Sequence, residues 1–267
     1  MDFSQPLVMG ILNVTPDSFS DGGQFLSVDD ALSRAIQMQE EGADIIDVGG
    51  ESTRPGADPI GMDEEADRVL PVIEALKNVV SVPISVDTKK PAIMRAAVSA
   101  GAKMINDVNA LEADGAVELI SELGVPVCLM HANGDPRTMQ ENPTYRDVVQ
   151  EVRCYLRQRV DACLSAGVEQ KNIVIDPGFG FGKTVAHNYS LMKHLRELAF
   201  SELPIMIGVS RKSMIGALLN VQPRDRVAGG LALTAMAYGQ GARIFRTHDV
   251  RETKQCLHVC AAVMGAD

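Results

Sequence analysis

The chain has 267 residues, of which 46% are hydrophobic, and its formal net charge is −10. This acidic balance argues against nucleic acid as a partner, because neutralising phosphates requires a basic surface. It does not exclude an anionic small molecule, since a few well-placed Arg and Lys residues make a locally positive site. No apolar run approaches the roughly 18 residues of a membrane span, and residues 1–20 lack a signal-peptide pattern. We therefore expect a cytoplasmic protein that does not bind a membrane.

The five cysteines show neither a metal-binding pattern nor a disulfide framework. Cys256 and Cys260 stand one helical turn apart, but there is no Cys-x-x-Cys pair, and no His or second pair completes a zinc pattern. We interpret the cysteines as free thiols in a reducing compartment.

Eight short apolar runs along the chain each end in a cluster of polar residues. The runs are residues 7–12, 44–48, 82–86, 103–105, 125–130, 172–175, 204–209 and 242–245. The polar clusters that follow them begin at Asn13, Glu51, Asp87, Asn106, His131, Asp176, Ser210 and Arg246. The spacing between successive runs leaves room for one helix, which is what the crossover between parallel strands requires.

The helical stretches between the runs have recognisable boundaries. One covers residues 28–41, and a second begins with the acidic triplet 63–65, where the helix dipole favours carboxylates. A third has Pro91 in its first turn and ends at Gly101. The longest covers residues 145–166.

Eight strands that alternate with helices predict a single (β/α)₈ TIM barrel over residues 1–267, since such barrels occupy about 250 residues. Active sites of these barrels lie at the C-terminal ends of the strands, so the polar clusters indicate where the chemistry takes place. Residues 13–27, 49–62 and 131–144 are long connections on that face. We expect them to be functional loops, the first two of them mobile.

Residues 178–184 (Gly-Phe-Gly-Phe-Gly-Lys-Thr) suggest a phosphate-binding loop, but the pattern fails. It would require glycine at position 177, where the chain has Pro177, and the next helix is expected only at about His187. We instead expect an aromatic-bearing loop behind Asp176, with Phe179 available to pack on a flat ligand.

Two aspartates end strands, Asp87 in Ser-Val-Asp-Thr and Asp176 in Val-Ile-Asp-Pro-Gly. A carboxylate at the mouth of a barrel can accept two parallel hydrogen bonds from an amino-substituted heterocycle, or bind a metal ion. The alternative is a cap on the loop or helix that follows. Because both lie on one rim with Asn106 and Asp107 between them, we favour a ligand site.

Histidine and basic side chains follow several of the other strands. His131 has no nucleophile motif to serve, so we expect it to be structural or to orient the substrate. Arg246 and His248 end the last strand, where barrels often bind phosphate, and a guanidinium can hold a phosphate with two hydrogen bonds. Lys212 follows the seventh strand and is expected to reach the ligand.

Two long signatures and six shorter motifs resemble the bacterial dihydropteroate synthases, in the order of that family. The long signatures are residues 9–23 and 47–56, and the shorter motifs are residues 85–88, 105–108, 129–131, 176–180, 210–213 and 246–248. The resemblance spans essentially the whole chain. It implies a transferase that joins (7,8-dihydropterin-6-yl)methyl diphosphate to 4-aminobenzoate, giving 7,8-dihydropteroate and diphosphate in folate synthesis.

The resemblance also implies a pterin site. Asp176 and Asn106 would face the amino-pyrimidine edge, whose donors suit a carboxylate and an amide. Asp87 would meet the other side of the pterin, and Lys212 would donate to the ring carbonyl and N5 region. The remaining contacts with the flat ring would come from Val108, Met130, Phe179 and Gly208.

For the other groups the resemblance implies two further sets of residues and one metal ion. The diphosphate would contact Asn13, Thr53, Arg54, Arg246 and His248, with Mg²⁺ between Asn13 and the phosphates. Such an ion commonly shares substrate phosphates and keeps several waters. The 4-aminobenzoate would be bound by Ser18, Phe19, Thr53, Arg54, Pro55, Lys212 and Ser213.

The implied chemistry is SN1-like. Loss of diphosphate would leave a cation delocalised over the pterin, which the weakly nucleophilic aniline then attacks. The residues assigned to catalysis are Asp87 and Lys212 at the pterin, and Arg246 and His248 at the leaving group. Closure of the first two loops would exclude water, which otherwise captures the cation.

One position departs from some relatives, which have Arg where this chain has Asn109. The family further implies a homodimer, for which the only sequence support is apolar residues of the last helix such as Val259, Ala262 and Val263. It also implies inhibition by sulfonamides, which imitate aminobenzoate. Two alternatives stay open. A methyltransferase barrel that serves a corrinoid shares the pterin contacts but has no use for the aminobenzoate loops, and a non-catalytic pterin-binding homologue is the other.

Overall fold

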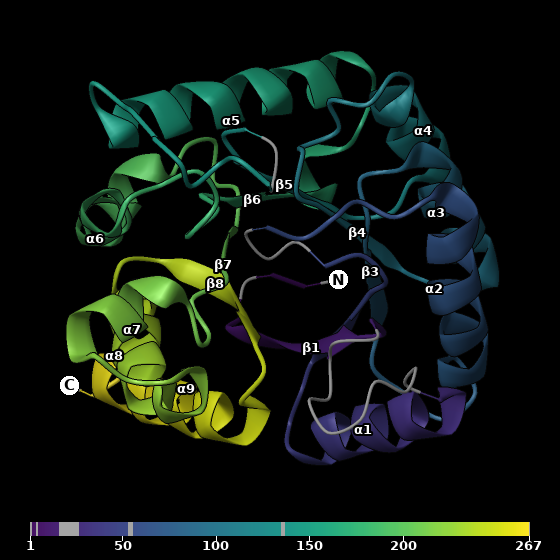
Figure 1. Ribbon diagram of the computed structural model, residues 1–267, viewed down its shortest axis with the longest axis horizontal. Coiled ribbons are helices and arrows are strands. Elements are labelled where there is room, and N and C mark those ends of the chain that lie inside the picture. Colours follow the sequence, from purple (N-terminus) through teal and green to yellow (C-terminus); the bar gives the residue numbers. More distant parts are fainter. Residues whose placement is uncertain (1, 4, 16–26, 53–55, 135–136, 267) are drawn as a thin grey trace.

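A computed structural model describes residues 2–3, 5–15, 27–52, 56–134 and 137–266. Its strands pair in parallel, each with the next in the chain, and β8 pairs with β1 to close a barrel (Figure 1). The expected (β/α)₈ fold is confirmed. The strands are β1 (Leu7–Asn13), β2 (Ile45–Gly49), β3 (Ile84–Asp87), β4 (Met104–Asp107), β5 (Val127–Met130), β6 (Ile173–Asp176), β7 (Ile205–Ile207) and β8 (Ala242–Thr247).

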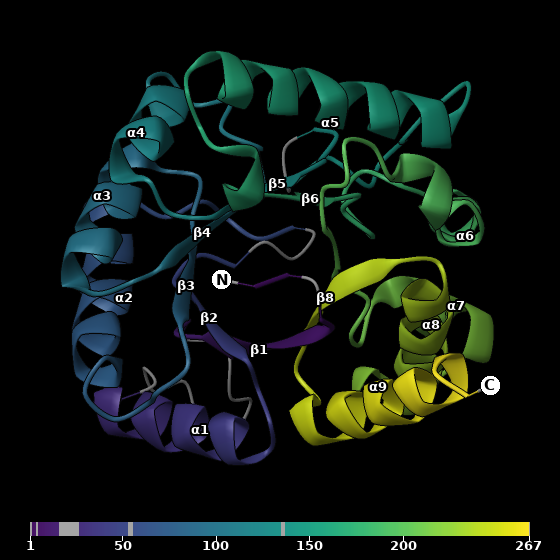
Figure 2. The same ribbon diagram turned by 180° about the vertical axis from the view of Figure 1, so that it is seen from behind.

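Helices surround the barrel, and in both face-on views the C-terminal helix lies beside α1 (Figures 1 and 2). The α-helices are α1 (Val28–Glu40), α2 (Met62–Leu76), α3 (Pro91–Ala100), α4 (Ala116–Leu123), α5 (Val148–Ser165), α6 (Val185–Lys193), α7 (Ser213–Leu219), α8 (Val227–Gly239) and α9 (Val250–Met264). Short 3-10 helices are η2 (Gln170–Asn172), η3 (Leu195–Leu198) and η4 (Pro223–Asp225). No helix in the described ranges combines the length and apolar character needed to cross a membrane.

Helix boundaries follow the local chemistry, with two corrections to the sequence analysis. Asp147 accepts hydrogen bonds from the second and third backbone amides of α5, so this helix begins at Val148 and not at 145. Thr184 caps α6, which begins at Val185, two residues before the expected start at His187. The expected end of α3 at Gly101 is confirmed.

Strands β1, β3, β4, β6 and β8 extend one or two residues into the polar clusters, and this determines where those polar side chains point. Successive side chains of a strand lie on opposite faces of the sheet. One apolar cluster fills the barrel interior, and a larger one lies between the strands and the helices. The interior cluster consists of Phe3, Met9, Ile45, Met104, Cys128, Val174, Met206 and Ile244. Residues two positions after its strand members therefore also point inward, toward the mouth.

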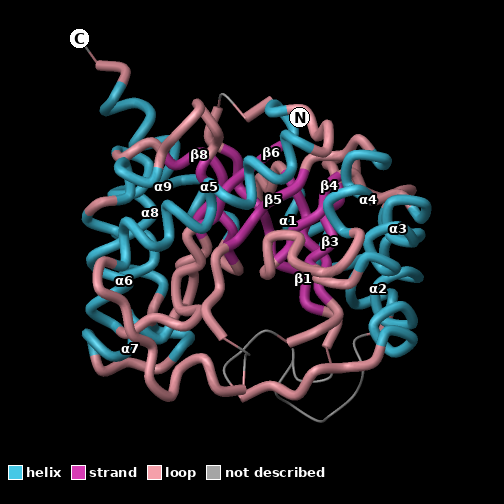
Figure 3. The backbone as a smooth tube through the Cα atoms, turned by 90° about the horizontal axis from the view of Figure 1, so that it is seen from above, coloured by secondary structure: helices cyan, strands magenta, loops and turns pink. Residues whose placement is uncertain are grey.

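The N-terminal segment closes the other end of the barrel. Phe3 is buried in the interior cluster, and the chain before β1 lies at the end opposite the loops that follow the strands (Figure 3). One end of the barrel is thus filled by apolar side chains, and the polar mouth lies at the C-terminal ends of the strands.

Candidate active site

The alternation of side chains brings five predicted site residues to the inside of the barrel mouth. Asn106 follows Met104 by two positions, Asp176 follows Val174, and Arg246 follows Ile244. Asp87 pairs with Asn106 across β3 and β4, and Met130 pairs with Asp176 across β5 and β6. Asp87, Asn106 and Asp176 are each at most 9% exposed, so they form a polar layer on an apolar barrel core.

Arg246 connects this layer with a residue that the sequence analysis missed. Its Nε donates to Asp47 Oδ2 at 2.7 Å and its Nη2 donates to Asp87 Oδ2 at 2.8 Å. Asp47 is fully buried and also accepts from Asn106 Nδ2 at 3.0 Å. The signal that could have identified Asp47 is its place two residues after the inward Ile45 in a conspicuous signature.

Burial raises the pKa values of the carboxyl groups in this layer. The pKa of Asp87 rises to about 7 because the group is desolvated, an effect that Arg246 opposes and Asp47 reinforces. Desolvation likewise raises the pKa of Asp176 to about 6, against the Gly178 amide and nearby cations that lower it. Burial lowers the pKa of Lys212 to about 8. All three groups therefore change protonation close to neutral pH.

A pocket lies beside these groups. It is lined by Asp87, Val108, Met139 and Phe181, among others. A Cβ atom added to Gly208 would have no heavy atom closer than 4.0 Å, so this glycine leaves room at the mouth. Met130 points inward from the end of β5.

The expectation that Phe179 contacts the ligand is wrong. Phe179 is 1% exposed and packs in the apolar layer between the barrel and the helices. Phe181 lines the pocket instead, and its ring centroid lies 4.3 Å from Lys212 Nζ. The aromatic loop behind Asp176 exists, but its second phenylalanine faces the site.

His131 is held by contacts with other side chains of the protein. Its Nδ1 lies 2.9 Å from the buried Lys183 Nζ, and its ring packs edge-on against Tyr155. Burial, together with the charge on Lys183, lowers the pKa of His131 to about 3. The imidazole is therefore neutral and can accept a hydrogen bond from the lysine.

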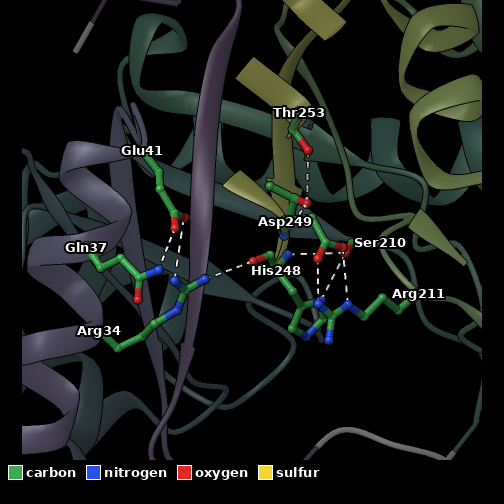
Figure 4. Close-up of polar contacts among 9 residues, drawn as sticks. Arg34, Gln37, Glu41, Ser210, Arg211, His248, Asp249 and Thr253 are labelled. Atoms are coloured by element: carbon green, nitrogen blue, oxygen red, sulfur yellow. Dashed lines mark hydrogen bonds and ion pairs between the residues drawn. The ribbon is translucent and has the colours of Figure 1, made fainter. Parts of the chain in front are cut away.

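His248 is fixed by side chains from α1 and from the loop after β7 (Figure 4). Its Nδ1 lies 3.0 Å from Ser210 Oγ, and its carbonyl accepts from Arg34 Nη2 at 3.0 Å. Arg211 forms two hydrogen bonds with Asp249, and Ser210 Oγ also donates to Asp249. Burial and then Arg246 lower the pKa of His248 to about 3, so its ring is neutral and not a cation.

Residues next to the inward positions hold the loops. Asp107 accepts hydrogen bonds at 2.8 Å from the backbone amides of Asn109 and Leu111. Thr247 Oγ1 accepts from the Asp249 amide at 3.0 Å. Neighbouring residues at the end of one strand thus have different roles: one faces the site, and the next fixes the loop around it.

Asn13 is the predicted magnesium ligand. A Cβ atom on Gly49 would lie 3.5 Å from Asn13 Oδ1 and 3.5 Å from Asp87 Cβ, which puts the amide oxygen beside Asp87. The described residues contain no group of three or more His, Cys, Asp or Glu that could hold a metal. The donor set fits an ion that takes most of its ligands from phosphates and water.

The predicted aminobenzoate and loop residues are only partly described. Ser18, Phe19, Thr53, Arg54 and Pro55 lie outside the described residues. Ser213 is exposed at the first position of α7, directly after Lys212.

The chain matches a known enzyme family. Residues 9–248 match the family model described as pterin binding enzyme. The chain belongs to the pterin-binding enzymes. Among these enzymes, the dihydropteroate synthase of Escherichia coli (strain K12) is 52% identical over 266 residues, which cover 100% of this chain and 94% of that protein.

Solved structures of pterin-binding enzymes agree with this result. Dihydropteroate synthase from Yersinia pestis, in a sulfonamide drug complex, superposes with a TM-score of 0.95 at 49% identity and covers 100% of this chain and 97% of its own. The Xanthomonas albilineans synthase in complex with 7,8-dihydropteroate superposes with a TM-score of 0.90 at 44% identity. The match covers 100% of this chain and 97% of that one. Within its family the chain therefore falls in the dihydropteroate synthase branch, and this full-length similarity favours that branch over the methyltransferase alternative.

Proposed function

We propose that the inward residues of the barrel mouth carry out the dihydropteroate synthase reaction. Different residues among them bind the pterin, the 4-aminobenzoate and the departing diphosphate. The reaction joins a dihydropterin methyl diphosphate to 4-aminobenzoate. The observation that carries the proposal is the buried layer of Asp87, Asn106 and Asp176 with the Arg246 guanidinium against it. Such a set combines acceptors for an amino-heterocycle with a cation for phosphate.

The pterin lies against Asp176 and Asn106. An ionised Asp176 accepts from the ring N–H and the exocyclic amine, and Lys212 donates to the opposite side of the ring. Val108, Met130 and the open space at Gly208 accommodate the flat ring. The complex of the Xanthomonas relative with 7,8-dihydropteroate supports this class of ligand.

The diphosphate binds to Arg246, His248 and Asn13, with Thr53 and Arg54 as further proposed contacts. The neutral His248 donates a hydrogen bond and adds no charge. Mg²⁺ is the proposed cofactor, with Asn13 as its protein ligand; when bound, it would neutralise charge on the departing diphosphate. We propose that the phosphates draw Arg246 away from Asp87 while Asp47 continues to hold it.

Asp87 stabilises the positive charge that develops on the pterin as diphosphate leaves. When the leaving group occupies the guanidinium, Asp87 exchanges Arg246 for the pterin. The positive charge that develops on the ring then takes over from Arg246 in keeping the carboxyl ionised. A charge fixed in a buried site stabilises a cation far better than one in water. No side-chain nucleophile is needed for this path.

The second substrate binds beside Lys212 and Ser213, with Ser18, Phe19, Thr53, Arg54 and Pro55 as the proposed loop contacts. Sulfonamides imitate 4-aminobenzoate and are the proposed inhibitors of this site. The sulfonamide complex of the Yersinia relative supports this assignment.

The proposed assembly is a cytoplasmic homodimer. Large apolar side chains are exposed on each of the last three helices: Leu218, Leu219, Met236, Val259, Val263 and Met264. A second copy of the chain would remove them from water. The five free cysteines are consistent with a reducing compartment.

The test is diphosphate release from the pterin substrate by the purified chain, with and without 4-aminobenzoate and with Mg²⁺ or EDTA. We expect dihydropteroate and diphosphate in equal amounts, only when metal and both substrates are present. Pterin that binds but yields no product at saturating substrates would instead identify a non-catalytic pterin-binding homologue.

A further inference from the structure

The lysine of the glycine-rich segment 178–184 points into the protein, where neither substrate can reach it. Lys183 is 3% exposed. Its Nζ lies 2.9 Å from His131 Nδ1 and donates to the carbonyls of Gly178 and Phe181, both at 2.9 Å. A fourth, longer contact of 3.3 Å reaches the His131 carbonyl. The catalytic assignments above leave this buried cation unused.

The Lys183 ammonium joins the loop after β5 to the loop after β6. His131 begins the first loop, whereas Gly178 and Phe181 belong to the second. Burying an ammonium group is strongly unfavourable unless hydrogen bonds and opposite charge compensate it. Here three backbone carbonyls, one imidazole and the nearby carboxylate of Asp176 compensate Lys183.

These two loops touch through their backbones, so side-chain packing cannot replace the cation between them. A Cβ atom on Gly178 would lie 1.9 Å from the His131 carbonyl oxygen, and one on Gly182 would lie 2.2 Å from that of Asn133. Tyr145 Oη also donates to the Gly182 carbonyl at 2.8 Å. The loops are held in one arrangement, and the Lys183 ammonium lies where they meet.

That arrangement reaches the pterin site through two residues. The Gly178 peptide accepts from Lys183 with its carbonyl, and its amide donates to Asp176 Oδ1 at 2.7 Å. Phe181, whose carbonyl also accepts from Lys183, presents its ring to Lys212 and to the pocket. A displacement of Lys183 would therefore be transmitted to Asp176 and to Phe181.

Lys183 also acts on Asp176 through charge. Three cations face the Asp176 carboxyl, namely Lys183, Lys212 and Arg246, and each opposes the burial that raises its pKa. Burial and, to a smaller extent, Lys212 lower the pKa of Lys183 to about 7, whereas Asp176 opposes them. Lys183 therefore carries its charge over the acid range in which Asp176 titrates, and the His131 ring that faces it is neutral. Removal of the Lys183 charge would leave Asp176 with two cations and a higher pKa.

We propose that Lys183 is a positioning residue of the pterin site, which orients the Asp176 carboxylate, keeps it ionised and fixes Phe181 against Lys212. This inference rests on the proposed assignment of Asp176 to the pterin. It also gives the lysine of the glycine-rich segment a role that requires no phosphate.

The test is calorimetric binding of 6-hydroxymethylpterin to the full chain between pH 5 and pH 8. In Lys183→Met we expect affinity at pH 7.5 to fall at least about tenfold, because buried acceptors lose their donor. We also expect the acid midpoint of binding, near the Asp176 pKa of about 6 in the wild type, to move to higher pH. Lys193→Met is the matched control, because Lys193 is exposed on α6 and should change neither quantity.

Lys183→Arg separates charge from geometry. It keeps the cation but not its compact shape, so we expect weaker binding with the wild-type midpoint, and this variant serves if Lys183→Met does not fold. Wild-type affinity in the folded variants, or weaker binding of Lys183→Met with an unmoved midpoint, would overturn the inference. A wild-type chain that does not bind the pterin would overturn the proposed function itself, which distinguishes the two failures.

Discussion

Arg246→Met should destabilise the protein in a way that depends on pH. The substitution keeps an apolar stem but removes the cation that both Asp47 and Asp87 contact, at 2.7 and 2.8 Å. Removing one partner from a buried ion pair typically costs about 3–5 kcal/mol. Because Asn106 still donates to Asp47 and Arg246 is itself 19% exposed, we expect a loss of about 3–4 kcal/mol in the free energy of unfolding.

The sign of the pH dependence follows from Asp87. Its pKa in the folded wild type is about 7, above the ordinary value because burial outweighs the attraction of Arg246. Without the cation this pKa rises further, so folded Arg246→Met retains a proton above pH 7 that the unfolded chain has lost. Above pH 7 the free energy of unfolding of the variant therefore falls with rising pH, whereas the contribution of Asp87 in the wild type no longer changes. The difference in stability between the two proteins grows by at most about 1.4 kcal/mol per pH unit.

Urea unfolding followed by circular dichroism at pH 6 and pH 9 measures this gap. Arg224→Met is the control, because Arg224 is 87% exposed and should unfold like the wild type at both pH values. An equal penalty for Arg246→Met at pH 6 and pH 9 would refute the coupling between Arg246 and the Asp87 carboxyl.

Three further substitutions test other parts of the structure. Gly178→Ala should lower the free energy of unfolding by at least about 3 kcal/mol, because φ is +67° and the new Cβ would lie 1.9 Å from the His131 carbonyl oxygen. The control is Gly230→Ala, which should be far less destabilising because nothing lies within 4 Å of the added Cβ. Equal melting temperatures of the two variants would contradict this prediction. Asp87→Asn should lower kcat about 100-fold with a much smaller change in free-pterin affinity, so parallel losses in kinetics and calorimetry would count against its role at the cation. Val263→Glu should convert a dimer to a monomer in light scattering, and an unchanged mass would exclude α9 from the interface.

Much of the barrel could be predicted because its strands are short apolar runs that end in polar residues. Helix boundaries also follow local chemistry, as the proline and glycine at the two ends of α3 illustrate. The ion pair between Asp47 and Arg246 could not be predicted in this way. It depends on the stagger of the strands, which sets Arg246 opposite Met9 and so brings it deep enough to reach Asp47.

The loop behind Asp176 shows a second limit. Phe179 and Phe181 have the same neighbours in sequence, and the positive φ angles at Gly178, Gly180 and Gly182 remove any regular periodicity that could tell them apart. Only the contact with the loop after β5 decides that Phe181 faces the pocket. The role of Lys183 was missed for the same reason, since its acceptors are backbone carbonyls, which no residue type reveals.

The division of labour between adjacent residues at the strand ends has a consequence for how such a site can change. Asn106 faces inward whereas Asp107 binds the following loop, and Arg246 and Thr247 divide in the same way. Substitutions at the inward position can alter ligand preference while the loop keeps its shape, and substitutions at the next position should reduce the amount of folded protein first. Along each strand end, positions where substitutions cause drug resistance would then alternate with positions where substitutions reduce the amount of folded protein. Selection for altered ligand binding and selection for folding would thus act on different residues.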